Sequence, residues 1–282
     1  MSIKPDVWAL HSRIALRSYD PGVYEEVCRE LCGIGELDYA DGIFKRWLNL
    51  DPGNPRARHL RAALLGRDVP ERCSESFVVH EFDTFSHSFD EVLQGLEYRA
   101  PALVAAALDD ELPGTDATLE VLDAGCGTGL CGPLLRRRAR RLVGVDLAGG
   151  MLTKAHHRGA YDELVQSELA SYMQAHPGAF DAVVASDVLV YFGALEPVFG
   201  AIAQALRPAG ALVVTVELLQ ADTVAGYRLN SSGRYSHTEA YLGRLSSSFG
   251  LQTRAMATEV LRLEGGAPVH GLVVRARRCG VA

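Results

Sequence analysis

The feature that most constrains the fold is an apolar stretch at 119–124 that runs directly into a glycine-rich turn. Residues 121–129 read VLDAGCGTG, and a helical pattern follows. Glycines at such a turn let a ligand approach the backbone closely, and open α/β sheets bind ligands at the carboxyl ends of their strands. We therefore expect a strand, a ligand-binding turn and a helix in this order.

Short apolar segments alternate with helical segments along the rest of the chain. The segments 119–124, 142–146, 164–168, 182–186 and 211–217 are predicted strands, and the alternation is typical of a parallel sheet. Two further strands, 257–263 and 269–276, are separated only by a short segment that contains Gly265 and Gly266. That spacing indicates a hairpin, so the last strand should run antiparallel. The predicted fold class is α/β, with a mostly parallel Rossmann-like sheet.

The N-terminal part has a helical pattern from 24 to 65, with breaks that indicate a hairpin and a third helix. It resembles one tetratricopeptide repeat and half of another. The residues that carry this resemblance are Gly35, Ala40, Phe44, Leu50, Asp51 and Pro52. Trp47 stands where that family prefers a small residue, which predicts looser or rearranged packing of the helices. We expect a helical module at 1–72, either a partner-binding surface or a cap, followed by a catalytic domain at 73–282.

The glycine spacing distinguishes between two kinds of nucleotide cofactor. The third glycine, Gly129, comes two residues after the second, and Leu130 occupies the position where a nicotinamide fingerprint requires glycine. Asp146 ends the next predicted strand and is placed to accept hydrogen bonds from ribose hydroxyls. The turn, together with Asp123, resembles motif I of class I S-adenosylmethionine (SAM) dependent methyltransferases. The resemblance implies SAM as cofactor and S-adenosylhomocysteine (SAH) as product.

The same resemblance assigns further residues to the cofactor site. In that family an apolar side chain packs on adenine, an acidic and apolar pair lies near its amino group, and the end of the fourth strand faces the methionine part. The positions so assigned are Asp123, Gly125, Cys126, Gly127, Asp146, Leu147, Met151, Glu168, Leu169, Ser186 and Asp187.

Nearly the whole chain resembles predicted bacterial methyltransferases that carry an N-terminal tetratricopeptide-like segment. The segments that match are 82–85, 89–90, 98–101, 232–237, 261–264 and 268–271. This pattern does not imply a substrate. The fourth strand lacks the Asn-Pro-Pro-Tyr type of sequence that marks amino methylation of bases or glutamine, so the acceptor is expected to be a different kind of molecule.

Two residues are candidates for catalysis. A hydroxyl or protonated amine acceptor must lose a proton, and histidine is suited to receive it near neutral pH. His237 lies in a polar and aromatic segment where this fold inserts its substrate lid; the alternative is that it caps a helix beginning near Thr238. Tyr191 follows the fourth strand. The residues predicted to surround the acceptor are Phe85, Phe89, Arg234, Tyr235, Tyr241 and Arg262.

Composition limits the partners. The formal net charge of -7 disfavours nucleic acid and acidic lipids. The basic run at 136–141 is expected to be a solvated helix end. No stretch approaches the roughly 18 apolar residues of a membrane span. The N-terminus lacks the apolar core of a signal peptide, so we expect a cytoplasmic protein. Its six cysteines lack metal-ligand spacing and are expected to be reduced.

The function that these features predict is methyl transfer to the oxygen or nitrogen of a metabolite or natural-product intermediate. One alternative is a peptide or protein acceptor held by the helical module. The other is a SAM-binding protein that transfers no methyl group.

Overall fold

A computed structural model describes residues 12–14, 19–114, 117–221 and 223–280. The chain forms two compact units. One comprises Met1–Phe77 and Leu229–Arg234, and the other comprises Val78–Arg228 and Tyr235–Ala282. The signal-peptide prediction concerns a terminus that lies mostly outside the described residues. Within those residues, no helix has the length and apolar character needed to cross a membrane.

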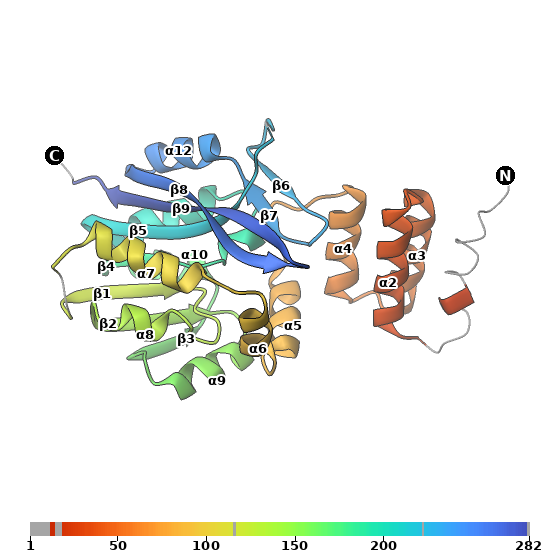
Figure 1. Ribbon diagram of the computed structural model, residues 1–282, viewed down its shortest axis with the longest axis horizontal. Helices are drawn as coiled ribbons and strands as arrows, with labels where there is room; N and C mark the ends of the chain where they lie inside the picture. Colours follow the sequence, from red (N-terminus) through yellow and green to blue (C-terminus); the bar gives the residue numbers. More distant parts are fainter. Residues whose placement is uncertain (1–11, 15–18, 115–116, 222, 281–282) are drawn as a thin grey trace. The chain divides into compact units, whose positions relative to one another are not determined.

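The first unit is built on three helices, which are α2 (Pro21–Gly33), α3 (Leu37–Leu50) and α4 (Pro55–Leu65) (Figure 1). Asp20 and Asn54 cap two of them, each followed by a proline whose fixed φ favours the first helical turn. The predicted hairpin and third helix are therefore present.

Trp47 lies at the centre of the core of this unit and is 0% exposed. Its ring packs against Phe44 and Tyr24, and its indole nitrogen donates to the Tyr19 hydroxyl over 3.0 Å. The expectation of looser packing at Trp47 is wrong, because the buried indole packs against aromatic rings of α2 and α3. The three helices do not by themselves establish a tetratricopeptide repeat.

The second unit contains the sheet. In the described part of the chain its strand order is β3-β2-β1-β4-β5-β7-β6, and β9 pairs with both β5 and β8 (Figure 1). The strands are β1 (Leu119–Ala124), β2 (Ala139–Asp146), β3 (Glu163–Gln166), β4 (Phe180–Ala185), β5 (Leu206–Leu218), β6 (Tyr227–Leu229), β7 (Tyr235–His237), β8 (Leu251–Glu264) and β9 (Ala267–Arg278). β1 to β5 are parallel, and β9 runs antiparallel to β5. The predicted mixed sheet is confirmed.

Helices cover both faces of this sheet, so its central strands are apolar on both sides. Side chains from α10 (Leu169–Ala175), α11 (Glu196–Ala205) and α12 (Glu239–Ser248) pack with Leu122 and Val143 on one face. Those of α7 (Ala100–Glu111) and α8 (Gly132–Leu135) pack with Val121 and Val184 on the other. The remaining helical elements are α5 (Glu75–Phe85), α6 (Phe89–Gly95), α9 (Gly149–Arg158) and the short η1 (Leu189–Tyr191).

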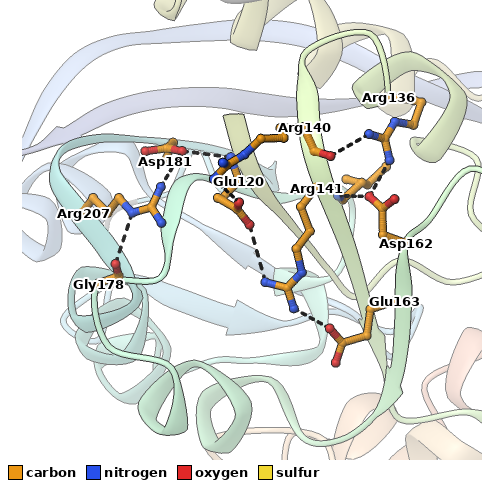
Figure 2. Close-up of polar contacts among 10 residues, drawn as sticks. Glu120, Arg136, Arg140, Arg141, Asp162, Glu163, Gly178, Asp181 and Arg207 are labelled. Carbon is orange, nitrogen blue, oxygen red and sulfur yellow. Dashed lines mark hydrogen bonds and ion pairs between the residues drawn. The ribbon is translucent and has the colours of Figure 1, made fainter. Parts of the chain in front are cut away.

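The basic run lies where α8 ends and β2 begins, as expected, but it is not simply solvated. Arg140 and Arg141 pair with Glu120 at the start of β1, and Arg141 also pairs with Glu163 (Figure 2). Arg138 is buried and pairs with Asp109. Neighbouring carboxylates, rather than the dipole of a four-residue helix, therefore compensate this charge.

Candidate active site

The glycine turn after β1 is shaped by one crowded and one open position. Gly125 has φ +76°, and a Cβ added there would lie 2.4 Å from Cγ2 of Val188. Gly127 has φ +53°, and an added Cβ would meet nothing within 4 Å. The first glycine therefore lets two backbone turns approach each other, whereas the second leaves a space beside the backbone that a ligand can enter.

Asp146 lies at the tip of β2, next to this turn. Its Oδ2 accepts from the Gly127 amide over 2.9 Å, and its Oδ1 accepts from the Ala148 amide, also over 2.9 Å. Burial raises the pKa of this carboxyl, and the amide bonds act against that shift. Each carboxylate oxygen has a second lone pair, so the held carboxylate can also accept from two ligand hydroxyls.

Asp123 is the most unusual charged group of the turn because it is 0% exposed. Its Oδ2 accepts from the Tyr161 hydroxyl over 2.6 Å, and its Oδ1 has no partner. Burial raises the pKa of Asp123 to about 7. A buried acceptor without a donor is costly to leave in this state, which favours a ligand donor at this position.

The remaining predicted cofactor residues line the turn and the two helices that follow. Met151 is fully buried in α9, Leu169 is buried in α10, and Leu147 is half-buried. Cys126 directs its thiol toward β2, because a Cβ added at Gly144 would lie 2.9 Å from its sulfur. Cys126 can therefore reach a ligand only through its backbone.

The prediction that strand three extends to Glu168 is wrong. β3 ends at Gln166, and Glu168 is the N-cap of α10, where its carboxylate accepts from the Ser171 amide over 2.8 Å. In this position its carboxylate satisfies one of the amides that have no partner within the first turn of the helix.

The end of β4 carries Ser186 and Asp187. Asp187 has φ +56°, its amide donates to Thr215 Oγ1 over 2.8 Å, and its carboxylate pairs with Arg262. The Ser186 hydroxyl lies beside Tyr98 and Cys131. Burial raises the pKa of Tyr98 well above its usual range, and the negative charge of Asp187 adds to the shift.

Aromatic rings gather next to this strand end. Tyr191 meets Phe82 edge to face with a centroid distance of 5.3 Å. Phe89 contacts both Phe82 and Phe85 in the same manner. The structure thus brings together three of the residues predicted from the sequence, Tyr191, Phe85 and Phe89, in one aromatic cluster.

The α5–α6 segment is also fastened to the glycine turn and to α9. Asp83 Oδ1 accepts from the Gly150 amide over 2.9 Å, and Asp90 Oδ1 accepts from Thr128 Oγ1 over 2.6 Å. Asp90 also pairs with Arg158. This segment therefore contacts the start of α9, where the predicted cofactor residue Met151 lies.

His237 lies in β7 and is 0% exposed. Its Nε2 is 3.1 Å from the Gly193 carbonyl, which assigns a proton to Nε2, and its Nδ1 has no partner. Burial lowers the pKa of His237 to about 4, so the ring is neutral at pH 7. The alternative role as a helix cap is wrong, because Thr238 caps α12 by accepting from the Tyr241 amide.

Of the other residues predicted to contact the acceptor, Tyr235 and Tyr241 lie with His237 around the Tyr227 ring. Tyr235 is fully buried in β7. The Tyr241 hydroxyl donates to Glu196 and accepts from the Leu195 amide. Arg234 belongs to the first unit. Arg262 is buried among three carboxylates, those of Asp187, Glu217 and Glu264.

Several residues near the glycine turn and the predicted site were not identified from the sequence. Tyr161 holds Asp123, and its ring lies within 3.0 Å of a Cβ added at Gly129, Gly132 or Gly144. Tyr98, Asp83 and Asp90 stand in segments noted for their family resemblance, although no site role was assigned to them. In the described ranges no group of His, Cys, Asp and Glu could hold a metal ion.

Comparison with known proteins agrees with this geometry. Residues 122–214 match the family model described as a methyltransferase domain. Over 87 residues the chain is 38% identical to human methyltransferase-like protein 27; the match covers 30% of this chain and 36% of that protein. The chain thus aligns with only about a third of the length of that curated relative.

Two solved structures share the fold. The Burkholderia thailandensis 1,6-didemethyltoxoflavin-N1-methyltransferase, solved with its substrate and SAH, is 22% identical with a TM-score of 0.58. That alignment covers 75% of this chain and 93% of that one. The Streptomyces coelicolor geranyl diphosphate C-methyltransferase, solved with Mg²⁺, geranyl diphosphate and SAH, is 17% identical with a TM-score of 0.50, covering 62% and 79%. The chain therefore has the fold of SAM-dependent methyltransferases, and the matched domain supports that class.

Proposed function

We propose that this chain is a SAM-dependent methyltransferase whose acceptor is a small molecule, methylated on oxygen or nitrogen. The observation that carries the proposal is the carboxyl edge of β1 and β2. Three features lie together there. The glycine turn leaves an open space beside Gly127, the Asp146 carboxylate is placed to accept from ribose hydroxyls, and one buried oxygen of Asp123 has no hydrogen-bond partner.

The residues present fit the cofactor. The bound cofactor supplies an activated methyl group on a sulfonium centre. Asp146 would hold the ribose, the space beside Gly127 would admit the backbone-facing part of the nucleoside, and Met151 and Leu169 would line the adenine. Asp123 and the strand end at Ser186 and Asp187 would face the methionine part.

The aromatic cluster favours a small acceptor. Phe82, Phe85, Phe89 and Tyr191 form an apolar wall beside the end of β4. Such a wall can exclude water and orient a flat or apolar molecule, and alignment of this kind contributes about 7 to 11 kcal/mol to related reactions. The two solved neighbours act on different acceptors, one at nitrogen and one at carbon by their names, so they do not decide between atoms.

His237 is the proposed proton acceptor, with Tyr191 contacting the acceptor molecule. The ring is neutral at pH 7 and its Nδ1 lone pair has no partner in the protein, so it can accept a proton, but burial lowers its pKa to about 4 and makes it a weaker base than a free imidazole. The ring is closed from solvent and packs against Tyr227 and Tyr241, so an acceptor molecule would reach Nδ1 only if these rings moved. Replacing His237 with Ala should preserve SAH affinity and lower turnover by roughly a hundredfold. If the Ala variant turned over at the wild-type rate, His237 would not be the proton acceptor.

Calorimetric titration tests the function itself. We expect SAM and SAH to bind to the purified chain with one site each, and NAD to bind more weakly or not at all. Incubation with SAM and fractionated small-molecule extracts should then release SAH, whereas protein extracts should not. Tighter binding of NAD contradicts the cofactor. Binding without SAH release from any fraction favours a SAM-binding protein without transfer activity.

A further inference from the structure

We propose that Arg262 is a positioning residue for the cofactor site, acting through the backbone of Asp187. The inference rests on the proposed function, because it concerns how the edge that would hold SAM keeps its shape. It also replaces the earlier expectation that Arg262 is one of the residues that surround the acceptor.

Arg262 is committed to groups within the protein. Its side chain is 3% exposed, and each of its three nitrogens contacts a different carboxylate. Nη1 lies 2.9 Å from Asp187 Oδ2 and Nε lies 2.7 Å from Glu264 Oε1, while Nη2 pairs with Glu217. A guanidinium enclosed in this way has no face left to clamp a substrate anion.

Asp187 is the member of this cluster that needs support. Its φ of +56° lies in the left-handed region, which residues other than glycine adopt only when surrounding contacts hold them there. Two such contacts exist. Thr215 on β5 accepts from the Asp187 amide, and Arg262 on β8 binds its carboxylate. The backbone of Asp187 is therefore held from β5 and its side chain from β8.

The conformation of Asp187 determines where the adjoining residues lie. Val188 follows it and packs so closely on the glycine turn that a Cβ at Gly125 would be 2.4 Å from its Cγ2. Ser186 precedes it and lies beside Tyr98 and Cys131. If Asp187 relaxed to negative φ, Val188 would shift against Gly125, and the turn that would receive the cofactor would change shape.

A double-mutant cycle tests this mechanism. SAH is titrated calorimetrically into the wild type, Arg262→Met, Asp187→Gly and the double variant. We expect Arg262→Met to weaken SAH binding at least tenfold in the wild-type background. Glycine adopts the left-handed conformation without a side-chain restraint. In the Asp187→Gly background the same substitution should therefore change SAH affinity by less than twofold.

Stability separates positioning from a purely structural role. Arg262→Met leaves buried carboxylates unpaired and should lower the unfolding midpoint in both backgrounds. Arg138→Met is the matched control, because Arg138 is also buried and ion-paired, but with Asp109 at the amino end of the sheet. It should lower the midpoint without changing SAH affinity. If Arg262→Met does not fold, Arg262→Lys takes its place in the same cycle, with a smaller expected loss.

The outcomes are distinguishable. An equal loss of SAH affinity in both backgrounds, or no loss in either, overturns the role of Arg262 while leaving the proposed cofactor intact. If the wild-type chain binds no SAH, the proposed function is overturned. The positioning role of Arg262 is then overturned as well, because it rests on that function.

Discussion

At the amino ends of strands β1 to β5, carboxylates pair with arginines, whereas Asp123 and Asp146 at the carboxyl ends of β1 and β2 do not. Asp162 Oδ2 accepts from the Leu142 amide and pairs with Arg136, and Asp181 Oδ2 accepts from the Glu120 amide and pairs with Arg207 (Figure 2). The pKa of Asp162 is accordingly held below its ordinary value, mainly by the Leu142 amide.

The opposite edge keeps its carboxylates in less favourable surroundings. Asp123 has an unpartnered oxygen and a raised pKa, the pKa of Asp146 is also raised by burial, and Asp187 has a left-handed backbone. These features cost stability in the free protein. Strained backbone and unsatisfied polar groups of this kind concentrate at functional sites, because a bound ligand can supply the hydrogen-bond partners that the protein lacks. The amino edge therefore stabilises the fold, and the carboxyl edge is the proposed binding site.

The largest expected effect comes from Gly125→Ala. The new methyl group would overlap Val188, so the cofactor turn must shift and SAH affinity should fall at least a hundredfold, or about 2.7 kcal/mol. Gly178→Ala at the amino edge is the control, since Gly178 also has positive φ, +61°, but no atom within 4 Å of an added Cβ. Its SAH affinity should be unchanged. Calorimetry giving equal losses for both would mean that backbone strain alone is responsible.

Asp146→Ala should come next. Removing a carboxylate that would accept two ribose hydroxyls should weaken SAH binding by about tenfold to a hundredfold, since hydrogen bonds to charged groups contribute about 1.5 to 3 kcal/mol. Asp181→Ala removes a carboxylate that likewise accepts from a backbone amide, but at the amino edge. That variant should lose stability and retain affinity. Unchanged SAH affinity in Asp146→Ala would remove Asp146 from the site.

Asp123→Asn tests the cost of the unsatisfied carboxyl through its pH dependence. The pKa of Asp123 is raised to about 7, whereas the unfolded value is about 3.9. Between these pH values the folded chain retains a proton that the unfolded chain has released, so stability from this group is lost as pH rises toward 7. Asn carries no such dependence. Urea unfolding at pH 5 and pH 8 should show the variant gaining about 2 kcal/mol over the wild type at the higher pH.

Asp162→Asn is the matched control for that experiment. The pKa of Asp162 is lowered in the fold, so its stabilising effect is present above the unfolded pKa and lost on acidification. The control should therefore be destabilised relative to the wild type at pH 8, which is the opposite sign. The same sign in both variants would contradict the contrast between the two edges.

The parallel sheet, the final hairpin and the glycine turn could be predicted because their signals are local. Continuous apolar strands, Gly265-Gly266 between two strands and the 121–129 run each fix a conformation without knowledge of distant residues. Strand boundaries shifted by up to six residues, since β8 begins at Leu251 rather than at 257, and the short strands β6 and β7 were not predicted.

What could not be predicted depends on contacts between distant segments. The hydrogen bond from Tyr161 to Asp123 joins residues 38 positions apart, and the ion pair between Arg262 and Asp187 joins residues 75 positions apart. No spacing rule links such pairs. The full burial of Trp47 and His237 likewise follows from rings contributed by other elements, which the sequence pattern around each residue does not show.

The smallest effect is expected from Arg140→Ala at the amino edge. The Arg140 side chain is 65% exposed and pairs with Glu120, which keeps Arg141 as a second partner. Exposed ion pairs contribute little because water and salt screen them, so the free energy of unfolding should change by about 0.5 kcal/mol or less. SAH affinity should be equal to that of the wild type within twofold. A greater loss of affinity would show that the amino edge shapes the binding edge through the strands, and the division between a stabilising end and a binding end would then fail.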